Sequence, residues 1–486
     1  MEISKKSFII LFTIIVFLAF FLRIYQLELK PMHHDEAILA YYYLIPQLSY
    51  QPLNFLGIEY HGLAFHYFTF PFIKIFGFSL FSMRLSAAFI GVLTVLLLYF
   101  LKDEIGKLGT LISALILSIS PIFVYYSRQY TGYPFYLFFI LLLIIFTVKF
   151  SKSEKPSFLY LIAITSAILL NINEAFIVFL FILGMFIYST YLFNLEEYER
   201  FLQPFKRIPL KKYLYAFFIL IFVFLMLHTS FFTNIKNING LISADSEMTT
   251  KAINTGHNKG FFYYIKLMTP FEFPLLFLSA LGLFYHKRSS FSRFIIVWSV
   301  FSLLIFSLIS YKTNWTLPAI IFPLIFLAGI GADKIFEEKN LITISLAILL
   351  SLLIIVNIGL SYQQNFSFVN DFKKNKIGYV EASTDTLRLV KDILEYSKDN
   401  RTDVLISASS YWPLPMMLDN KNIAIQYITL TDLNTSNYQN FQVYIVNEEQ
   451  LKSRSDEFDY KSYEMRENYY ITVLFKIKDS QIQSFK

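Results

Sequence analysis

Four ionisable residues stand in a row directly after the first apolar run of the chain: His33, His34, Asp35 and Glu36. A carboxylate can serve as a general base, and imidazoles can move protons or bind metals near neutral pH. Ionisable groups are expensive at a membrane, so a dense cluster of them favours a function there. We interpret the cluster as a reactive site at a membrane surface; the alternative is a solvated acidic start to a helix.

Asp35 and Glu36 are adjacent, so on a helix they diverge by about 100° and cannot both point at one atom. One acid can then address a substrate while the other orients a neighbour or a metal. The acids would lie in the first turn of a helix, where the helix dipole favours them. That helix is expected to lie in the membrane interface, because apolar and aromatic residues recur at helical spacing: Ile38, Leu39, Tyr42 and Tyr43.

A second acidic motif, Glu59 with His61 and Gly62, follows in the same loop, ahead of another apolar-aromatic stretch at 63–78. Taken by itself, a bland surface loop explains this motif about as well as a site does. Together the two motifs supply enough carboxylates and imidazoles for a divalent cation, although their spacing matches no zinc signature. The candidate metal ligands are Asp35, Glu59, His61 and His257, the last more often an ordinary loop histidine.

Three cations stand near the ends of apolar runs: Arg84, Arg128 and Lys312. Lysine and arginine in such places commonly extend their charged ends to the membrane surface, which costs little. The alternative is a phosphate clamp, because guanidinium groups pair well with phosphate oxygens. The placement of all three on the face that carries the acids makes the two interpretations about equally good.

The composition indicates a polytopic helical membrane protein. The chain has 486 residues, of which 56% are hydrophobic and 16% charged, and its mean hydropathy is +0.51. Soluble domains carry about 25% charged residues. About eleven transmembrane helices are predicted from apolar runs near 20 residues long, at 7–27, 84–101, 108–126, 131–149, 157–171, 174–193, 213–232, 268–286, 292–310, 316–334 and 341–360.

Loop charges predict the topology. Lysine and arginine concentrate in alternate connections, which indicates a cytoplasmic N-terminus, a first outer loop at 28–82 with interfacial helices, and an extracytoplasmic tail at 361–486. The net charge of +7 lies largely in these short loops, so no nucleic-acid partner is expected. The chain has no cysteine, which excludes disulfides and thiolate chemistry.

The sequence divides into a transmembrane domain at 1–360 and a soluble extracytoplasmic domain at 361–486. In the tail, a helical pattern at 385–398 precedes short β-branched runs at 403–407, 422–429, 441–447 and 469–477, which predicts a small α/β domain. The aromatic stretch at 411–415 can pack internally, dock onto the membrane domain or bind a sugar face, and internal packing is the favoured interpretation.

Several short strings occur in an order that resembles the GT-C glycosyltransferases: HHDEA (33–37), EYHG (59–62), YYSRQY (125–130), YKTNW (311–315), LAGIGAD (327–333) and YWPLP (411–415). The resemblance covers most of the chain. It is strongest to the protein O-mannosyltransferase and aminoarabinose-transferase branch, and within it to a flippase-associated subfamily from glycan-assembly clusters. That subfamily usually has proline where this chain has Leu63 and Asn314, which weakens any assignment of substrate.

The resemblance implies a polyprenyl-phosphate-linked sugar as donor and no nucleotide cofactor. It assigns catalysis to Asp35, as base or acceptor-orienting group, with Glu36 and Glu59. It also places Arg84, Arg128 and Lys312 at the lipid phosphate. Together with these cations, we predict substrate contacts for four further residues: His33, His34, His61 and Trp315. The acceptor would be a hydroxyl of a lipid, glycan or protein at the outer face of the cell membrane, with membrane lipids around the site. A non-catalytic or flippase-type accessory of lipid-linked glycan assembly is the alternative, ahead of a transporter, since no internal repeat is visible.

Overall fold

The computed structural model describes most of the chain, and its residues form two compact units. The membrane unit comprises Met1–Leu27 and Pro46–Phe368, and the tail unit comprises Glu28–Ile45 and Val369–Lys486. Residues 28–45, assigned from the sequence to the transmembrane domain, therefore group with the tail. The described residues are 3–55, 62–240, 258–285, 289–337, 341–368, 371, 374–379, 381–398, 400–408, 411–418, 422–428, 441–447 and 458–477.

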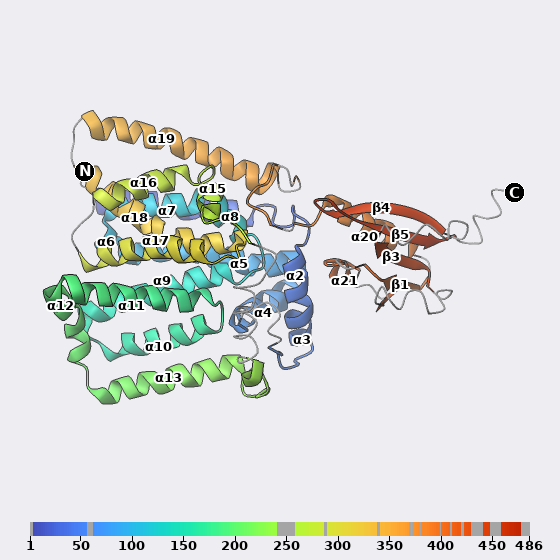
Figure 1. Ribbon diagram of the computed structural model, residues 1–486, viewed down its shortest axis with the longest axis horizontal. Coiled ribbons are helices and arrows are strands. Elements are labelled where there is room, and N and C mark those ends of the chain that lie inside the picture. Colours follow the sequence, from blue (N-terminus) through green and yellow to red (C-terminus); the bar gives the residue numbers. More distant parts are fainter. Residues whose placement is uncertain are drawn as a thin grey trace. The chain divides into compact units, whose positions relative to one another are not determined.

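The membrane unit is a stack of apolar helices lying side by side (Figure 1). Within the described ranges, eight helical stretches are long and apolar enough to span a membrane. They are α1 (Lys5–Ile24), α5 to α6 (Leu80–Leu97, η2 Leu98–Leu101, Lys102–Ile105), α9 (Tyr133–Ser153), α11 (Ala175–Phe193), α13 (Leu210–His228), α17 (Ser290–Leu308), η3 with α18 (Asn314–Thr316, Leu317–Ile335), and α19 with η4 (Leu341–Tyr362, Gln363–Ser367).

The remaining helices of this part are shorter. A ninth span arises if α7 (Lys107–Ile119) and α8 (Pro121–Ser127), bent by 60° at Ser120, count as one. The predicted runs at 157–171 and 268–286 correspond to the shorter apolar helices α10 (Pro156–Leu170) and α16 (Phe273–Phe284). Further helices are α3 (Ile45–Leu48), α4 (Ala64–Phe76), α12 (Leu195–Lys206) and α15 (Tyr263–Met268). The predicted polytopic helical fold is confirmed.

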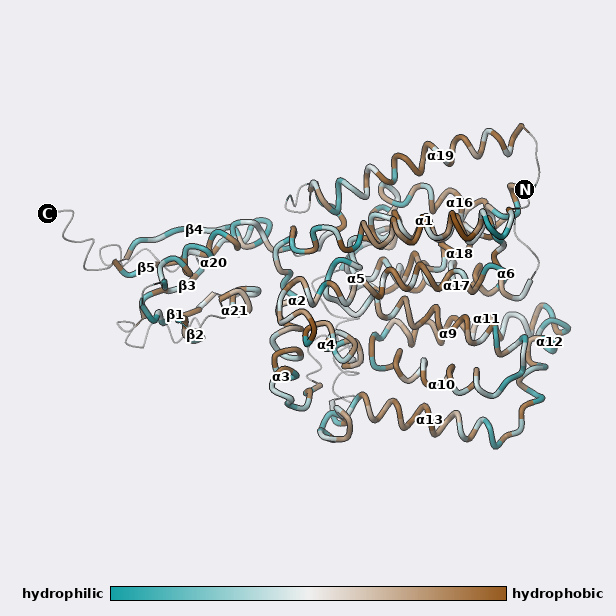
Figure 2. Tube along the Cα trace, turned by 180° about the vertical axis from the view of Figure 1, so that it is seen from behind, coloured by the Kyte–Doolittle hydropathy of each residue, from teal (hydrophilic) through white to brown (hydrophobic). Residues whose placement is uncertain are grey.

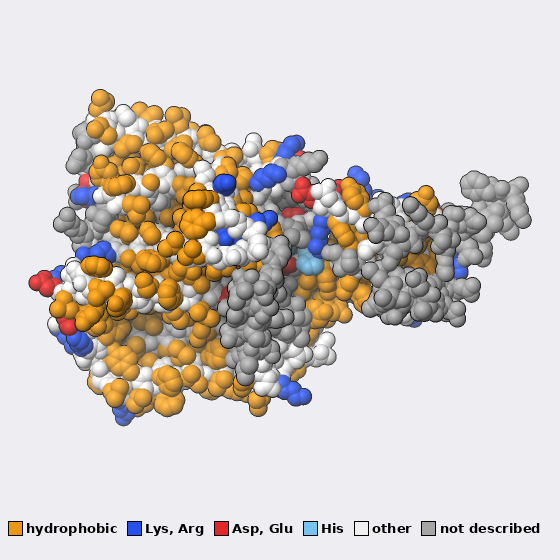
Figure 3. Space-filling model, in the orientation of Figure 1, with side chains coloured by type: hydrophobic (Ala, Val, Ile, Leu, Met, Phe, Trp, Pro, Cys, Tyr) orange, Lys and Arg blue, Asp and Glu red, His pale blue; other side chains and the backbone are white. Residues whose placement is uncertain are grey.

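The two units differ in the hydropathy of their residues. Hydrophobic residues run along the helices of the membrane unit, whereas polar residues are frequent in the strands of the tail (Figure 2). Hydrophobic side chains also cover most of the visible face of the helical part (Figure 3). An apolar outer surface of this size is unfavourable in water and suits lipid.

Helix α18 lies in the interior of the membrane unit. In its most apolar stretch 89% of the residues are buried, against 17% in that of α19. Glycines let its backbone approach two neighbours closely. A Cβ on Gly329 would lie 2.1 Å from Ser113 Oγ and 2.6 Å from the Gly109 carbonyl oxygen of α7. A Cβ on Gly282 of α16 would lie 2.3 Å from the Leu327 carbonyl oxygen. Packing of small residues at helix interfaces is the usual means of association in membranes.

We expect Gly329→Val to destabilise the membrane unit by about 1–3 kcal/mol, because the added atoms overlap backbone that cannot move freely. Gly184→Val is the matched control, since no heavy atom lies within 4 Å of a Cβ at this helical glycine. Thermal unfolding of both variants in the same detergent measures the difference. Equal melting temperatures for the two variants would contradict the packing described.

The tail unit contains a five-stranded mixed sheet in the order β2-β1-β3-β5-β4. Strands β2, β1 and β3 are parallel, and β5 pairs antiparallel with β3 and β4. The elements are α20 (Thr384–Tyr396), β1 (Thr402–Ile406), α21 (Leu414–Met417), β2 (Ile423–Tyr427), β3 (Val443–Asn447), β4 (Phe458–Arg466) and β5 (Tyr469–Lys476). Leu389 and Ile393 of α20 pack on one face of the sheet in a common core with Val404 and Ile445. The predicted α/β domain is thus confirmed.

Residues 28–45 add a helical segment to the tail unit. It comprises α2 (His34–Leu39) and the π-helix η1 (Ala40–Leu44). Residues 28–45 include the four consecutive ionisable residues His33, His34, Asp35 and Glu36.

Candidate active site

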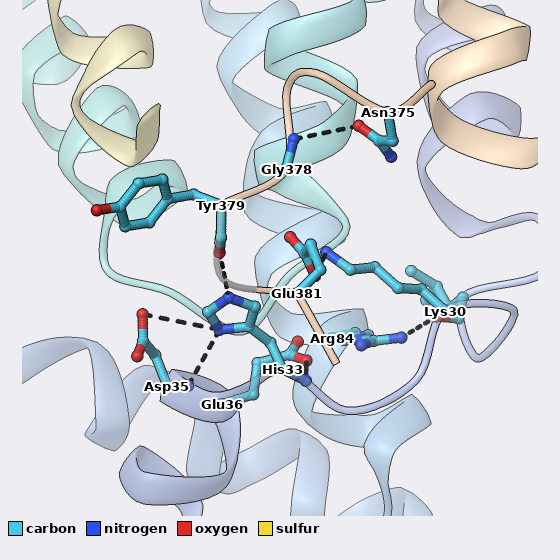
Figure 4. Close-up of polar contacts among 10 residues, drawn as sticks. Lys30, His33, Asp35, Glu36, Arg84, Asn375, Gly378, Tyr379 and Glu381 are labelled. Atoms are coloured by element: carbon cyan, nitrogen blue, oxygen red, sulfur yellow. Dashed lines mark hydrogen bonds and ion pairs between the residues drawn. The ribbon is translucent and has the colours of Figure 1, made fainter. Parts of the chain in front are cut away.

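His33 starts helix α2 and fixes the backbone around Asp35. Its Nδ1 accepts a hydrogen bond from the Asp35 backbone N–H at 3.0 Å, and its Nε2 lies 2.8 Å from the Tyr379 carbonyl oxygen. A carbonyl can only accept, so the ring proton belongs on Nε2. The Asp35 carboxylate lies 3.7 Å from Nδ1, too far for a hydrogen bond. The histidine therefore orients the turn that presents Asp35 (Figure 4).

The two adjacent acids have different surroundings. Glu36 is fully buried, and its Oε2 accepts from the His33 backbone N–H at 2.9 Å, which completes a capping box. The Asp35 side chain remains 27% exposed. Glu36 thus contributes to the start of the helix, while Asp35 has an open side from which a substrate hydroxyl can approach.

Three contacts from distant parts of the tail surround this turn. The Tyr379 carbonyl binds His33, Glu381 forms an ion pair with Lys30 at 2.5 Å, and an Nη of Arg466 lies 2.5 Å from His34 Nδ1. The partners are separated by 346 residues for Tyr379 and 432 for Arg466. No local sequence signal connects such distant residues, and the sequence alone does not reveal Lys30, Tyr379, Glu381 or Arg466.

His34 is a hydrogen-bond acceptor for Arg466. Burial lowers its pKa to about 4, with a further lowering by the Arg466 charge and an opposing contribution from Asp35. Burial also lowers the pKa of Arg466, while the Asp35 charge raises it. Asp35 therefore shares its surroundings with a neutral imidazole and a guanidinium.

The pKa of His34 predicts acid sensitivity. In the unfolded chain His34 has its ordinary pKa of 6.5 and binds a proton more tightly than in the folded chain, where its pKa is about 4. The stability of the fold therefore falls as the pH drops from about 6.5 towards 4. At about 1.4 kcal/mol per pKa unit the loss is roughly 3 kcal/mol. Urea unfolding at pH 7 and pH 4.5 should show a smaller pH effect for His34→Asn than for the native chain. An unchanged pH effect would exclude His34 as its source.

Arg128 directs its guanidinium inward. It donates to the carbonyl oxygens of Leu22 at 3.0 Å, Tyr25 at 2.6 Å and Gln26 at 2.8 Å, and it lies over the Phe366 ring. These carbonyls end helix α1 and carry the negative end of its dipole. Burial lowers the pKa of Arg128 to about 10, and the Arg84 charge adds to the lowering.

Arg84 and Lys312 are buried as well. Arg84, on α5, donates to the Leu27 carbonyl oxygen at 2.7 Å. Lys312 Nζ donates to the carbonyl oxygens of Lys259, at 3.1 Å, and Ile309. Trp315 lies half-buried in η3. The structure thus places Arg84, Arg128 and Lys312 inside the membrane unit. Their side-chain N–H groups donate to main-chain carbonyl oxygens at loop and helix ends. A role with phosphate stays a prediction.

Arg23 is a buried cation that the sequence reasoning missed. It donates to the carbonyl oxygens of Leu117, at 2.8 Å, and Ser118, at 3.1 Å, near the end of α7. Its place inside the predicted first span was the available signal, since a charge there needs a partner.

The second acidic motif falls outside the described residues, as Glu59, His61 and His257 do. Gly62, next to it, donates to the Ile172 carbonyl at 3.2 Å, and a Cβ on it would lie 2.1 Å from the Asn171 carbonyl carbon. The absence of a side chain at Gly62 therefore permits its backbone to lie close to the turn at Asn171, which follows α10. Among the described residues no group of three or more His, Asp and Glu is arranged to hold a metal ion.

Residues 60–228 match a family model described as dolichyl-phosphate-mannose-protein mannosyltransferase. The match includes Arg84 and Arg128 and begins after the 33–36 cluster. None of the curated proteins matches the chain.

Solved structures match over a longer range. ArnT from Cupriavidus metallidurans, bound to undecaprenyl phosphate, is 12% identical, with a TM-score of 0.66 over 97% of this chain and 98% of that chain. The chain has the GT-C fold. A second GT-C protein, the oligosaccharyltransferase from Archaeoglobus fulgidus tethered to an acceptor peptide, is 12% identical, with a TM-score of 0.53 over 84% of this chain. This chain spans 62% of that protein's length.

A further structure of the same archaeal oligosaccharyltransferase, in complex with Zn and sulfate, has a TM-score of 0.57 at 12% identity and covers 90% of this chain and 68% of that one. The GT-C fold that the resemblance predicts is confirmed. The chain is a multi-pass membrane protein. The 97% coverage by the ArnT structure shows that the GT-C likeness extends into the tail unit as well as the helices.

Proposed function

We propose that this protein is a membrane glycosyltransferase that moves a sugar from a polyprenyl-phosphate donor to a hydroxyl of a lipid, glycan or protein. The observation that carries the proposal is the likeness, over 97% of the chain, to an ArnT structure that contains undecaprenyl phosphate. The family-model match, to mannosyltransferases that use dolichyl-phosphate-mannose, supports the same donor class.

Asp35 is the proposed base or acceptor-orienting group. Its carboxylate is partly exposed in the first turn of α2, where the backbone is held by His33. An acceptor hydroxyl bound to it would lose its proton to the carboxylate as the oxygen attacks the anomeric carbon. The bond from that carbon to the phosphate oxygen breaks, and the polyprenyl phosphate leaves as a stabilised anion. Direct displacement of this kind inverts the anomeric configuration.

Cations would favour the leaving phosphate. Arg84, Arg128 and Lys312 give the membrane unit buried positive charge, and buried charge stabilises a developing anion more strongly than exposed charge does. A divalent cation would add to this effect. Asp35 is the single described member of the proposed metal set, so the described residues do not establish a fit for a metal and no step is assigned to one.

Sugar transfer in proteoliposomes tests the proposal. The purified protein is supplied with a panel of polyprenyl-phosphate sugars, and transfer to lipid, glycan and peptide acceptors is measured. Transfer from at least one donor is expected. If no donor supports transfer while glycan assembly in cells still requires the protein, the accessory function replaces the proposal.

We also propose a cytoplasmic N-terminus and an extracytoplasmic tail in the cell membrane, from the loop charges. The chain has no cysteine, so single cysteines report sidedness cleanly. Lys152→Cys, in a basic connection, and Glu467→Cys, in the tail, are both introduced into intact cells. An impermeant maleimide should label position 467 and not position 152. The reverse pattern would invert the topology.

A further inference from the structure

Five aromatic side chains gather in the tail unit, and two of them, Tyr41 and Tyr42, are close along the chain to Asp35. Ring centroids of Tyr41 and Trp412 are 5.5 Å apart, those of Tyr42 and Trp412 6.3 Å, and those of Tyr41 and Tyr42 5.1 Å. Tyr411 continues the group, at 5.7 Å from Trp412 and 5.1 Å from Tyr427. We call these five residues the aromatic cluster.

The cluster is open to the outside. Tyr41, Tyr42 and Tyr427 are 41%, 37% and 48% exposed, and Tyr411 and Trp412 are half-buried, whereas the neighbouring Tyr43 is 4% exposed. Large aromatic rings left exposed together, in a unit that has its own buried core, are typical of a binding surface.

Four of the five members of the cluster are tyrosines, whose hydroxyl groups can both donate and accept hydrogen bonds. Burial raises the pKa of Tyr427, and the hydroxyls of Tyr41, Tyr411 and Tyr42 raise it further. The surface therefore combines ring faces with a group of neutral hydrogen-bond donors and acceptors. None of its five members carries a charge.

The position of the cluster relates it to the proposed base. Tyr41 and Tyr42 lie in η1, which continues α2 without a break, and a π-helical turn of this kind is often found at functional sites. Tyr42 lies seven positions after Asp35, a rise of about 10 Å along the helix. A short saccharide whose end lies at Asp35 can therefore reach the rings.

We propose that the aromatic cluster of Tyr41, Tyr42, Tyr411, Trp412 and Tyr427 is a binding subsite for the saccharide chain of the acceptor. Sugar rings present apolar C–H faces that pack on aromatic rings and hydroxyl edges that bond to tyrosine hydroxyls. The alternative occupant is the lipid interface, where tyrosine and tryptophan are also frequent. Tyr41 and Tyr42 lie in the helical segment that begins at the proposed base, which favours the saccharide, since its reacting hydroxyl would lie at Asp35.

The assignment of the saccharide as the acceptor rests on the proposed function. The first experiment therefore measures saccharide binding alone, which needs no sugar transfer. Tryptophan fluorescence of the full chain in nanodiscs is followed while linear tetrasaccharides of glucose, mannose and galactose are added. We expect a saturable change with at least one of them, absent from Trp412→Phe. Tyr41→Ala and Tyr42→Ala should each weaken the affinity at least tenfold. No change with any tetrasaccharide would overturn the subsite.

Tyr460→Ala is the matched control, since Tyr460 is 65% exposed in the same unit and lies outside the cluster. An equal loss of affinity in this variant would show a general defect and overturn the assignment. Tyr42→Phe keeps the ring if Tyr42→Ala does not fold, and should retain most of the affinity. Quenching by brominated lipids in the nanodisc that is lost in Trp412→Phe, and so does not come from Trp298 or Trp315, would overturn the saccharide in favour of the membrane.

A kinetic experiment separates acceptor from donor. In a transfer assay with a glycan acceptor, Tyr41→Ala is expected to raise the acceptor KM at least tenfold and leave the donor KM unchanged. A rise in the donor KM alone would overturn the acceptor assignment. Tetrasaccharide binding in a protein that transfers no sugar would disprove the proposed function and leave the subsite in place.

Discussion

Asp35→Asn is expected to lower kcat of sugar transfer by ~10²–10⁴, the usual contribution of a general base, while the chain folds normally. Asparagine has nearly the same shape, and the Asp35 side chain is partly exposed, so little packing is lost. The contact from His33 Nδ1 reaches the Asp35 backbone N–H and survives the change. The donor KM should stay unchanged, because the carboxylate acts on the acceptor hydroxyl.

The tail offers a closely matched control. Asp385 is the second residue of α20, as Asp35 is of α2, and its backbone N–H likewise donates to the side chain two residues earlier, here Ser383 Oγ at 3.1 Å. Asp385→Asn removes an acid from the same helical position and should leave transfer unchanged. If both substitutions lower kcat equally, the effect of Asp35 is one of charge or stability and the base lies elsewhere.

The membrane fold is readable from the sequence because lipid imposes a simple rule. Main-chain groups must be satisfied within each spanning segment, so every span appears as an apolar run of helical length. The runs at 157–171 and 268–286 test the limits of that rule. They contain interruptions or charges at their ends, and they form the short helices α10 and α16.

The strand β4 was not predicted, although β1, β2, β3 and β5 were. Its residues Phe458–Arg466 include Asp459, Lys461 and Glu464, and it lies at the edge of the sheet with most of its first half exposed. Strand prediction rested on apolar and β-branched runs, which β2 keeps at the opposite edge of the sheet and which the charged residues of β4 interrupt. β4 is held in the sheet by its pairing with β5, which is a property of the folded domain.

The site was predicted in part for a related reason. Adjacent ionisable residues such as His34 and Asp35 are visible as a pattern, and the start of a helix at His33 follows from the acids in its first turn. The partners of these residues come from the far end of the chain, where Arg466 and Glu381 have no distinctive neighbours in sequence. Such contacts depend on how α2 packs on the tail unit, which a single sequence does not encode locally.

Buried cations show the same distinction. Arg128 was identified as a candidate phosphate ligand from its place at the end of an apolar run. In the structure its Nη1 donates to the carbonyl oxygens of Leu22 and Tyr25, at the end of α1. The sequence indicates that such a charge needs partners; it does not tell a helix terminus from a ligand. The C-terminal end of a helix and a phosphate ligand are both negative. A guanidinium at a helix end can therefore stabilise the fold and still contribute to the positive potential of a site.

Glu381→Gln is expected to destabilise the tail unit by about 3–5 kcal/mol, since it leaves the buried charge of Lys30 without its carboxylate. The two side chains are 9% and 7% exposed for Lys30 and Glu381, and Nζ lies 2.5 Å from Oε2. Lys30 lies three residues before His33, so loss of this ion pair should also loosen the turn that presents Asp35. Urea unfolding of the full chain, followed by Trp412 fluorescence, measures the first effect, and transfer kcat measures the second.

The double variant Lys30→Met with Glu381→Leu separates the ion pair from mere packing. Replacing both charges with apolar side chains of similar volume removes the desolvation penalty, so most of the stability should return. Arg388→Gln is the surface control. Arg388 pairs with Asp385 at 2.9 Å, is 76% exposed, and should cost less than about 1 kcal/mol. If Glu381→Gln costs no more than Arg388→Gln, residues 28–45 are held by their apolar contacts and the ion pair does not position Asp35. If stability returns in the double variant but kcat does not, the charges themselves contribute to the site, since the fold alone would then be insufficient to restore the alignment of Asp35.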